Sequence, residues 1–307
     1  MSMSRVEFNS NGLTLVGHLY TPEGFDAAQT YPAVIVTPPA HQIKEQTAAQ
    51  YAPFFTQKGY VYFAFDYNSK GESESYQEGF RNDENNFRKQ EDLRNAISYL
   101  SSLDFVDSNA LFGVGICGGG NVMSGVVISD LRIRAFASIS AMLATDALFF
   151  ADQDATRQLF TSANQARQKI YETNTPELID LFSYDDPDYP ANNPDASPGQ
   201  LEGFDYYGTE RAGSQRYPRF SNQVFANIYD SVTINIGEQY ADRMLQPFIG
   251  VVGEKAETAV FTRGFYDKVT SDKEYFVVPG ATHLDLYDQT QFIAVAVDKI
   301  TEFFSVH

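Results

Sequence analysis

Gly115-Ile116-Cys117-Gly118-Gly119 is the stretch that decides the fold predicted for this chain. The residues before it, Asn109–Val114, suit a buried strand, and those after it, Asn121–Ile128, suit a buried helix. Glycines two residues to either side of Cys117 suit a sharp turn, because larger side chains there would clash. This is the context of a G-x-S-x-G nucleophile elbow, with Cys in place of Ser. The helix N-terminus would favour the thiolate of Cys117, and the alternative is a buried, inert thiol.

Composition indicates an ordinary globular protein of 307 residues and excludes several partners. The 22 Lys and Arg residues against 40 Asp and Glu residues give a net charge of −18, which repels nucleic acid and anionic lipid. No apolar run reaches the roughly 18 residues of a membrane span, and no signal peptide is visible. One cysteine excludes an internal disulfide. We expect a cytoplasmic protein with a small-molecule substrate; a homodimer is compatible with the sequence.

Strands alternate with helices over most of the chain. An edge hairpin is predicted around Asn11-Gly12, between two alternating apolar runs. Further strands are expected at 33–37, 61–66, 135–140, 248–252 and 275–278, with helices near 45–58, 87–103, 260–269 and 292–304. This order predicts a doubly wound, mostly parallel α/β sheet.

Residues 141–243 interrupt the alternation. Helices are expected near 155–171 and 175–182, followed by a turn-rich segment. We interpret residues 141–243 as a helical cap inserted into a core formed by residues 1–140 and 244–307. Ligands bind beyond the carboxyl ends of the strands in such sheets, so the cap should roof a pocket that contains Cys117.

Two late loops supply candidates for a base and an acid. His283 follows the last predicted strand, in the order nucleophile, acid, His that a catalytic triad of this type requires. Glu257, a few residues beyond the preceding strand, is the preferred acid, with Glu254 the second choice and Asp146 the third. The acid would fix the tautomer of His283 and stabilise the imidazolium.

The backbone N–H groups of Gly118 and of the loop after residues 33–37 are expected to form an oxyanion hole. That loop begins Pro38-Pro39-Ala40-His41, and proline has no N–H, so Ala40 or His41 is the donor.

The cap and the same loop also supply candidate substrate contacts. Aromatic residues are abundant in the cap and suit the walls of an apolar pocket. Tyr206, Tyr207 and His41 are the candidate wall residues, and Arg211 or Arg216 is the candidate polar contact.

Motifs along nearly the whole chain carry a resemblance to a known family. They are Ile43-Lys44-Glu45-Gln46, Ala64-Phe65-Asp66, Gly71-Glu72-Ser73, Gly115-Ile116-Cys117, Asp205–Arg211, Gly253–Thr258 and Gly280–Tyr287. The chain resembles the α/β-hydrolase superfamily, and its dienelactone-hydrolase-like branch in particular, where the elbow is G-x-C-x-G-G. The resemblance implies Cys117 as nucleophile, His283 as base and Glu257 as acid. The loop at Pro38-Pro39 and a Glu in place of the usual Asp depart from the family pattern.

The preferred function is a cysteine hydrolase that cleaves an ester, lactone or thioester through an acyl-enzyme. The alternatives are an acyltransferase with the same triad and a non-enzymatic ligand-binding or thiol-sensing protein. No cofactor or metal is expected, because His283 and Asp285 lack a third ligand and Gly118-Gly119-Gly120 lacks the Lys of a phosphate loop.

Overall fold

The computed structural model describes residues 1–182 and 184–307, and within them eight strands form one central sheet. The strands are β1 (Ser2–Ser10), β2 (Leu13–Thr21), β3 (Tyr31–Thr37), β4 (Val61–Phe65), β5 (Val106–Ile116), β6 (Phe136–Ile139), β9 (Phe248–Gly253) and β10 (Lys273–Val278). Their order is β1-β2-β4-β3-β5-β6-β9-β10. β2 is antiparallel to β1 and β4, and the other neighbours pair in parallel. The predicted fold class is confirmed.

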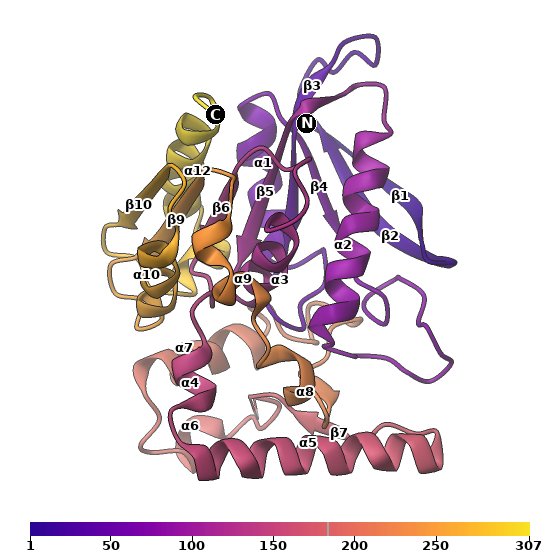
Figure 1. Cartoon of the computed structure of the whole chain (residues 1–307), viewed down its shortest axis with the longest axis vertical. Coiled ribbons are helices and arrows are strands. Elements are labelled where there is room, and N and C mark those ends of the chain that lie inside the picture. The colour runs from indigo at the N-terminus through magenta and orange to yellow at the C-terminus, as the bar shows by residue number, and fades with distance from the viewer. Residues whose placement is uncertain (183) are drawn as a thin grey trace.

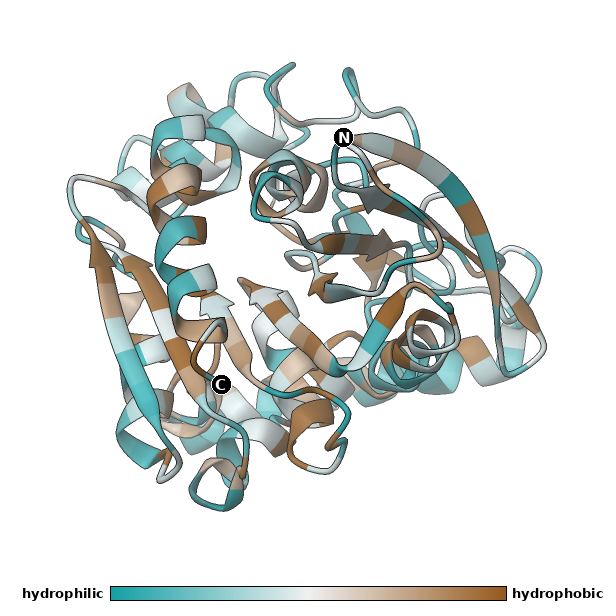
Figure 2. Ribbon diagram, turned by 90° about the horizontal axis from the view of Figure 1, so that it is seen from above, coloured by the Kyte–Doolittle hydropathy of each residue, from teal (hydrophilic) through white to brown (hydrophobic). Residues whose placement is uncertain are grey.

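The hairpin β1–β2 lies at the edge of the sheet. Asn11 and Gly12 form its turn with φ values of 51° and 90°, a backbone that Asn and Gly adopt most readily. Hydrophilic and hydrophobic residues alternate along β1 from the end marked N in Figure 2. The pattern that predicted the hairpin therefore reflects a strand with one face in water.

Each face of the sheet carries its own hydrophobic core, because side chains alternate along every strand. Val34 and Val36 of β3 belong to one core, and Ala33 and Ile35 belong to the other. The first core is covered by α1 (Thr47–Gln57), α11 (Asp285–Asp288) and α12 (Thr290–Phe304), and the second by α2 (Asn86–Ser101), α3 (Gly118–Val127) and α10 (Ala259–Lys268).

Most of the chain between β6 and β9 lies at one end of the sheet, with the 21-residue helix α5 outermost, whereas residues 236–239 pack against α3 (Figure 1). The elements of this segment are α4 (Asp146–Phe150), α5 (Gln153–Thr173), β7 (Leu178–Asp180), α6 (Tyr189–Asn192), α7 (Pro198–Tyr207), β8 (Gln223–Phe225), α8 (Tyr229–Val232), α9 (Ile236–Gln239) and the 3-10 turn η1 (Ala241–Arg243). No strand of the central sheet comes from this segment in the part described. The cap boundaries at 141 and 243 stay a prediction.

One predicted helix in this segment is wrong. Residues 178–180 form β7, which pairs antiparallel with β8, with Ile179 opposite Val224. Asn174 ends α5 in a left-handed conformation, with φ at 55°. The partner strand lies more than forty residues away in the printed sequence, so local periodicity could not reveal the pairing.

None of the helices in residues 1–182 and 184–307 has the length and hydropathy that crossing a bilayer requires.

Candidate active site

Cys117 stands at the turn between β5 and α3 with a φ of 50° and a ψ of −121°. A Cβ atom built on Gly115 would lie 2.6 Å from Cα of Gly120. One built on Gly119 would lie 2.2 Å from the carbonyl oxygen of Thr37. Both positions therefore require glycine, for the steric reason that predicted the turn. The close packing of backbone leaves Cys117 in a sparsely populated conformation at the carboxyl end of a central strand.

The backbone N–H groups of Gly118 and Ala40 and the hydroxyl of Tyr287 lie near the sulfur of Cys117, and as hydrogen-bond donors they lower the pKa of its thiol. Gly118 lies close against Ala40, because a Cβ atom on Gly118 would be 3.1 Å from the Ala40 nitrogen. The two N–H groups therefore converge on one point from α3 and from the loop after β3. Ala40 is one of the two donors predicted for this loop, because Pro38 and Pro39 have no N–H group.

Burial raises the pKa of the Cys117 thiol, and the hydrogen bonds from Tyr287, Gly118 and Ala40 act in the opposite direction without reversing it. Burial therefore acts against the thiolate that the helix N-terminus was expected to favour. Removal from water disfavours the charged sulfur more than the nearby donors favour it.

His283 lies in the segment between β10 and α11 with both ring nitrogens engaged. Nε2 is 3.0 Å from the hydroxyl oxygen of Tyr287, and Nδ1 hydrogen-bonds Oγ1 of Thr258. Burial lowers the pKa of His283 to about 4, so the ring is neutral near pH 7. In the described residues, the base candidate thus reaches Cys117 through Tyr287, a contact that the sequence analysis did not predict.

Of the three predicted acids, only Glu257 lines the cavity that contains Cys117 and His283. Glu257 is exposed, and a Cβ atom on Gly199 of α7 would lie 3.3 Å from its Oε2 atom. Oε2 of Glu254 accepts a hydrogen bond of 2.8 Å from the Gly280 N–H. Asp146 begins α4, and its N–H donates to Glu238. Residues 1–182 and 184–307 show no hydrogen bond between His283 and a carboxylate. Thr258, the neighbour of Glu257, is the partner of Nδ1. The sequence analysis missed Thr258, and the only signal for it was its position next to the preferred acid.

A cavity of about 960 Å³ opens onto Cys117 and combines core and cap residues. From the core it includes Ala40, Cys117, Thr258, His283 and Tyr287, and from the segment between β6 and β9 it includes Leu181, Phe182, Tyr184, Tyr189, Glu202 and Tyr207. Residues between β6 and β9 thus line the cavity together with Cys117, and aromatic rings are prominent among them.

Of the candidate substrate contacts, only Tyr207 lines this cavity. Its hydroxyl accepts a hydrogen bond of 3.0 Å from Nε2 of Gln42. His41 is buried behind the wall, and its ring lies edge-on to Phe182, Tyr207 and Phe220 at centroid distances of 5.0 to 5.5 Å. His41 therefore supports the wall and does not face a ligand.

Tyr206 and Arg211 fix the cap to the core. The Tyr206 hydroxyl is 2.9 Å from Oγ1 of Thr47 at the start of α1. Arg211 forms a bidentate pair with Asp288, with both distances at 2.7 Å, and its guanidinium lies over the ring of Tyr206. These contacts replace the role of substrate contact that was predicted for both residues, because their polar atoms are already engaged. Arg216, the alternative to Arg211, is also absent from the residues that line the cavity.

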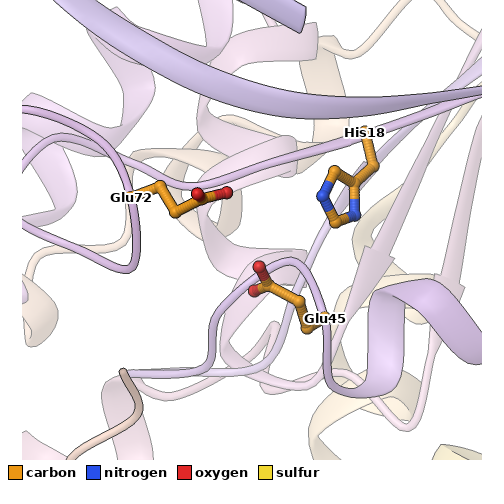
Figure 3. Close-up of side chains that lie close together, drawn as sticks. All are labelled: His18, Glu45 and Glu72. Carbon is orange, nitrogen blue, oxygen red and sulfur yellow. The ribbon is translucent and has the colours of Figure 1, made fainter. Parts of the chain in front are cut away.

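One group of side chains has the composition of a metal site. His18, Glu45 and Glu72 bring ligand atoms within 4.8 Å of one another, as Figure 3 shows. The buried ammonium of Lys44 lies 2.7 Å from Oε1 of Glu45 and 2.8 Å from Oε2 of Glu72, and it also pairs with Asp66. Lys44 already supplies the cation that balances these carboxylates, so we assign no metal here.

Several known proteins are similar to this chain in sequence or in structure. The family model described as the prolyl oligopeptidase family matches residues 46–186. The uncharacterized protein YcjY of Escherichia coli (strain K12) is 30% identical over 319 residues, which cover 99% of each chain. The polyketide transferase claH of Penicillium crustosum is 28% identical over 225 residues, covering 72% of this chain and 69% of claH. The crystal structure of the alpha/beta hydrolase GrgF from Penicillium sp. sh18 superposes with a TM-score of 0.77 at 20% identity, covering 100% of this chain and 99% of GrgF.

Proposed function

Since the chain belongs to the α/β-hydrolase-fold family that includes YcjY, we propose that it is an enzyme that cleaves an ester, lactone or thioester through an acyl-enzyme on Cys117. The observation that carries the proposal is the convergence of the Gly118 and Ala40 N–H groups on the sulfur of Cys117, at the floor of the cavity. A carbonyl attacked there would develop its negative charge within reach of both donors.

The proposed reaction has two halves. The sulfur of Cys117 attacks the acyl carbon, the Gly118 and Ala40 N–H groups stabilise the oxyanion, and the alcohol or thiol leaves with a proton. His283 then takes a proton from water as the water attacks the thioester, and Cys117 is regenerated. A thiolate is itself a good leaving group, so activated donors such as enol-lactones or thioesters suit this site better than alkyl esters or amides.

The cavity supports a small to medium acyl group. Its volume of about 960 Å³ falls in the range of ordinary ligand pockets, and the rings of Phe182, Tyr184, Tyr189 and Tyr207 line it. The tyrosine hydroxyls and polar side chains such as Glu202 and Thr282 offer hydrogen bonds beside the rings, which suits an acyl group that is aromatic or oxygenated. A small-molecule substrate and a cytoplasmic location, both predicted from composition, belong to the same proposal.

Acyl transfer is the second candidate, and the resemblance to a polyketide transferase favours it. The first half-reaction is the same, and the acyl-enzyme then passes its acyl group to an alcohol, amine or carbon nucleophile in place of water. The choice depends on which acceptor enters the cavity beside His283.

The test is a panel of p-nitrophenyl esters, acyl thioesters and lactones, assayed with wild type and Cys117→Ala. We expect turnover of at least one class, its loss in Cys117→Ala, and an acyl adduct on Cys117 by intact-protein mass spectrometry. Adding alcohols or amines separates hydrolysis from transfer, because a transferase forms the new ester or amide in preference to free acid. If every class is inert and no adduct forms, the enzymatic proposal fails and a ligand-binding or thiol-sensing protein replaces it.

A further inference from the structure

The hydroxyl of Tyr287 lies between the two groups that a cysteine hydrolase would couple directly. It hydrogen-bonds the sulfur of Cys117, and its oxygen is 3.0 Å from Nε2 of His283. The side chain of Tyr287 also lies close to the hydroxyl of Tyr207, which accepts a hydrogen bond from Gln42. Tyr287 is part of α11, two residues after the start of the helix, and its side chain is 1% exposed. The phenol is thus held in place from several sides.

We propose that Tyr287 is a catalytic residue that relays the proton between Cys117 and His283. The inference rests on the proposed function, because it assigns a role within the same acyl-enzyme chemistry. As the sulfur attacks the acyl carbon, the S–H proton passes to the Tyr287 oxygen while the Tyr287 O–H proton passes to Nε2 of His283. The imidazolium returns its proton through the same hydroxyl to the leaving alcohol or thiol, so Tyr287 is a neutral phenol before and after each transfer.

The charges of the resting site suit a relay. Burial first, and then the nearby Cys117, raise the pKa of Tyr287 well above its ordinary value, so the phenol does not act as a phenolate base. Burial also raises the pKa of the thiol and lowers that of His283, which leaves a neutral pair. A neutral thiol gains nucleophilicity only if its proton leaves as the new bond forms, and the hydroxyl of Tyr287 is the acceptor in contact with it.

Alkylation of Cys117 by iodoacetamide tests the relay without any substrate. We expect Tyr287→Phe to lower the alkylation rate at pH 7 by roughly tenfold or more, because the thiol loses its route to the base. In Tyr287→Phe the alkylation rate should then rise only at higher pH, where the thiol of Cys117 loses its proton to hydroxide. Tyr62→Phe is the matched control: it also removes a buried tyrosine hydroxyl, one that donates a hydrogen bond of 2.6 Å to the Ala48 carbonyl, and it is expected to alkylate like wild type.

A double substitution separates a relay from two independent effects. If Tyr287 connects Cys117 to His283, His283→Ala lowers alkylation in wild type but adds no further loss in Tyr287→Phe. A Tyr287→Phe protein that alkylates as fast as wild type, or faster, would show that the phenol only screens the thiol. Additive losses would show separate roles, and either result overturns the proposal. The two proposals can fail separately. If the two substitutions are non-additive in alkylation but the protein turns over no substrate of the panel, the relay stands and the proposed function is rejected.

Discussion

The hydroxyl of Thr258 hydrogen-bonds Nδ1 of His283, in the place where a triad would have a carboxylate. A hydroxyl can accept the Nδ1 proton and so leave Nε2 free to accept from Tyr287. It carries no charge, however, so it stabilises an imidazolium less than a carboxylate would. His283 in this site is therefore oriented by a neutral partner and is a weaker base than the histidine of an acid-bearing triad.

Thr258→Val should lower kcat by about tenfold or more, because the ring loses the contact that fixes its tautomer. Glu257→Gln is the comparison: Glu257 lines the same cavity, but Thr258 holds Nδ1 of His283, so the kcat of this variant should stay near wild type. Steady-state kinetics on the best substrate of the panel measures both. A crippled Glu257→Gln beside a normal Thr258→Val would restore Glu257 as the acid.

Gly118→Ala and Gly119→Ala should separate activity from stability. A Cβ atom at Gly118 would lie 2.9 Å from the Ala40 Cβ and push the second N–H donor away, so kcat should fall by up to about 100-fold while the fold is kept. At Gly119 the clash is with two backbone carbonyls, of Thr37 and Pro38, and should lower the free energy of unfolding by about 1–3 kcal/mol. Urea denaturation and kinetics on both variants check this, and a stable, fully active Gly119→Ala would contradict it.

Lys44→Met should reduce the free energy of unfolding by about 3–5 kcal/mol, because it leaves Asp66 buried without its cation. Lys299→Met is the control, since Lys299 pairs with Glu274 and Glu302 at the surface and should cost less than about 1 kcal/mol. Both values come from chemical denaturation at pH 7. Equal, small losses would mean that the three carboxylates around Lys44 do not depend on it.

Burial makes folding stability depend on the protonation of His41. Burial lowers its pKa to about 3 from an ordinary 6.5, so the unfolded chain takes up the proton first. The stabilisation is complete above pH 6.5 and is lost as pH falls towards 3, at about 1.4 kcal/mol per pH unit. His41→Asn keeps a residue that tolerates the φ of 53° and should remove this contribution. Urea denaturation between pH 7 and pH 5 should give the variant a shallower loss than wild type, and parallel curves would refute the assignment.

The sequence could predict the parts of the site that depend on local geometry. Gly115 and Gly119 determine the turn around Cys117, and the two prolines before Ala40 limit the donors in that loop. Tyr287 could not be predicted, because it and Cys117 come from segments that lie far apart in the sequence and on different elements of the fold. The acid was assigned to Glu257 from its place beyond the strand and from the family pattern, and only the folded structure shows that the neighbouring Thr258 hydrogen-bonds His283.

In the cap, the sequence predicted the residues that line the cavity better than the residues that attach the cap to the core. Aromatic composition indicated a lined pocket, and Phe182 and Tyr207 do line it. Arg211 and Tyr206 looked equally suited to a ligand, since no local pattern distinguishes a side chain that meets substrate from one that meets Asp288 or Thr47. The strand at 178–180 was mistaken for a helix because its partner is distant in sequence.

The contacts that attach the cap have a kinetic consequence. Gln42 donates to Tyr207, and Gln46 donates to the Ala212 carbonyl at 2.7 Å, so two cap residues are held by the loop that also carries Ala40. Lifting the cap to exchange ligands therefore pulls on the segment that positions one of the two donors at Cys117. A raised cap would therefore displace the Ala40 donor, and catalysis at Cys117 would require the cap to be in place.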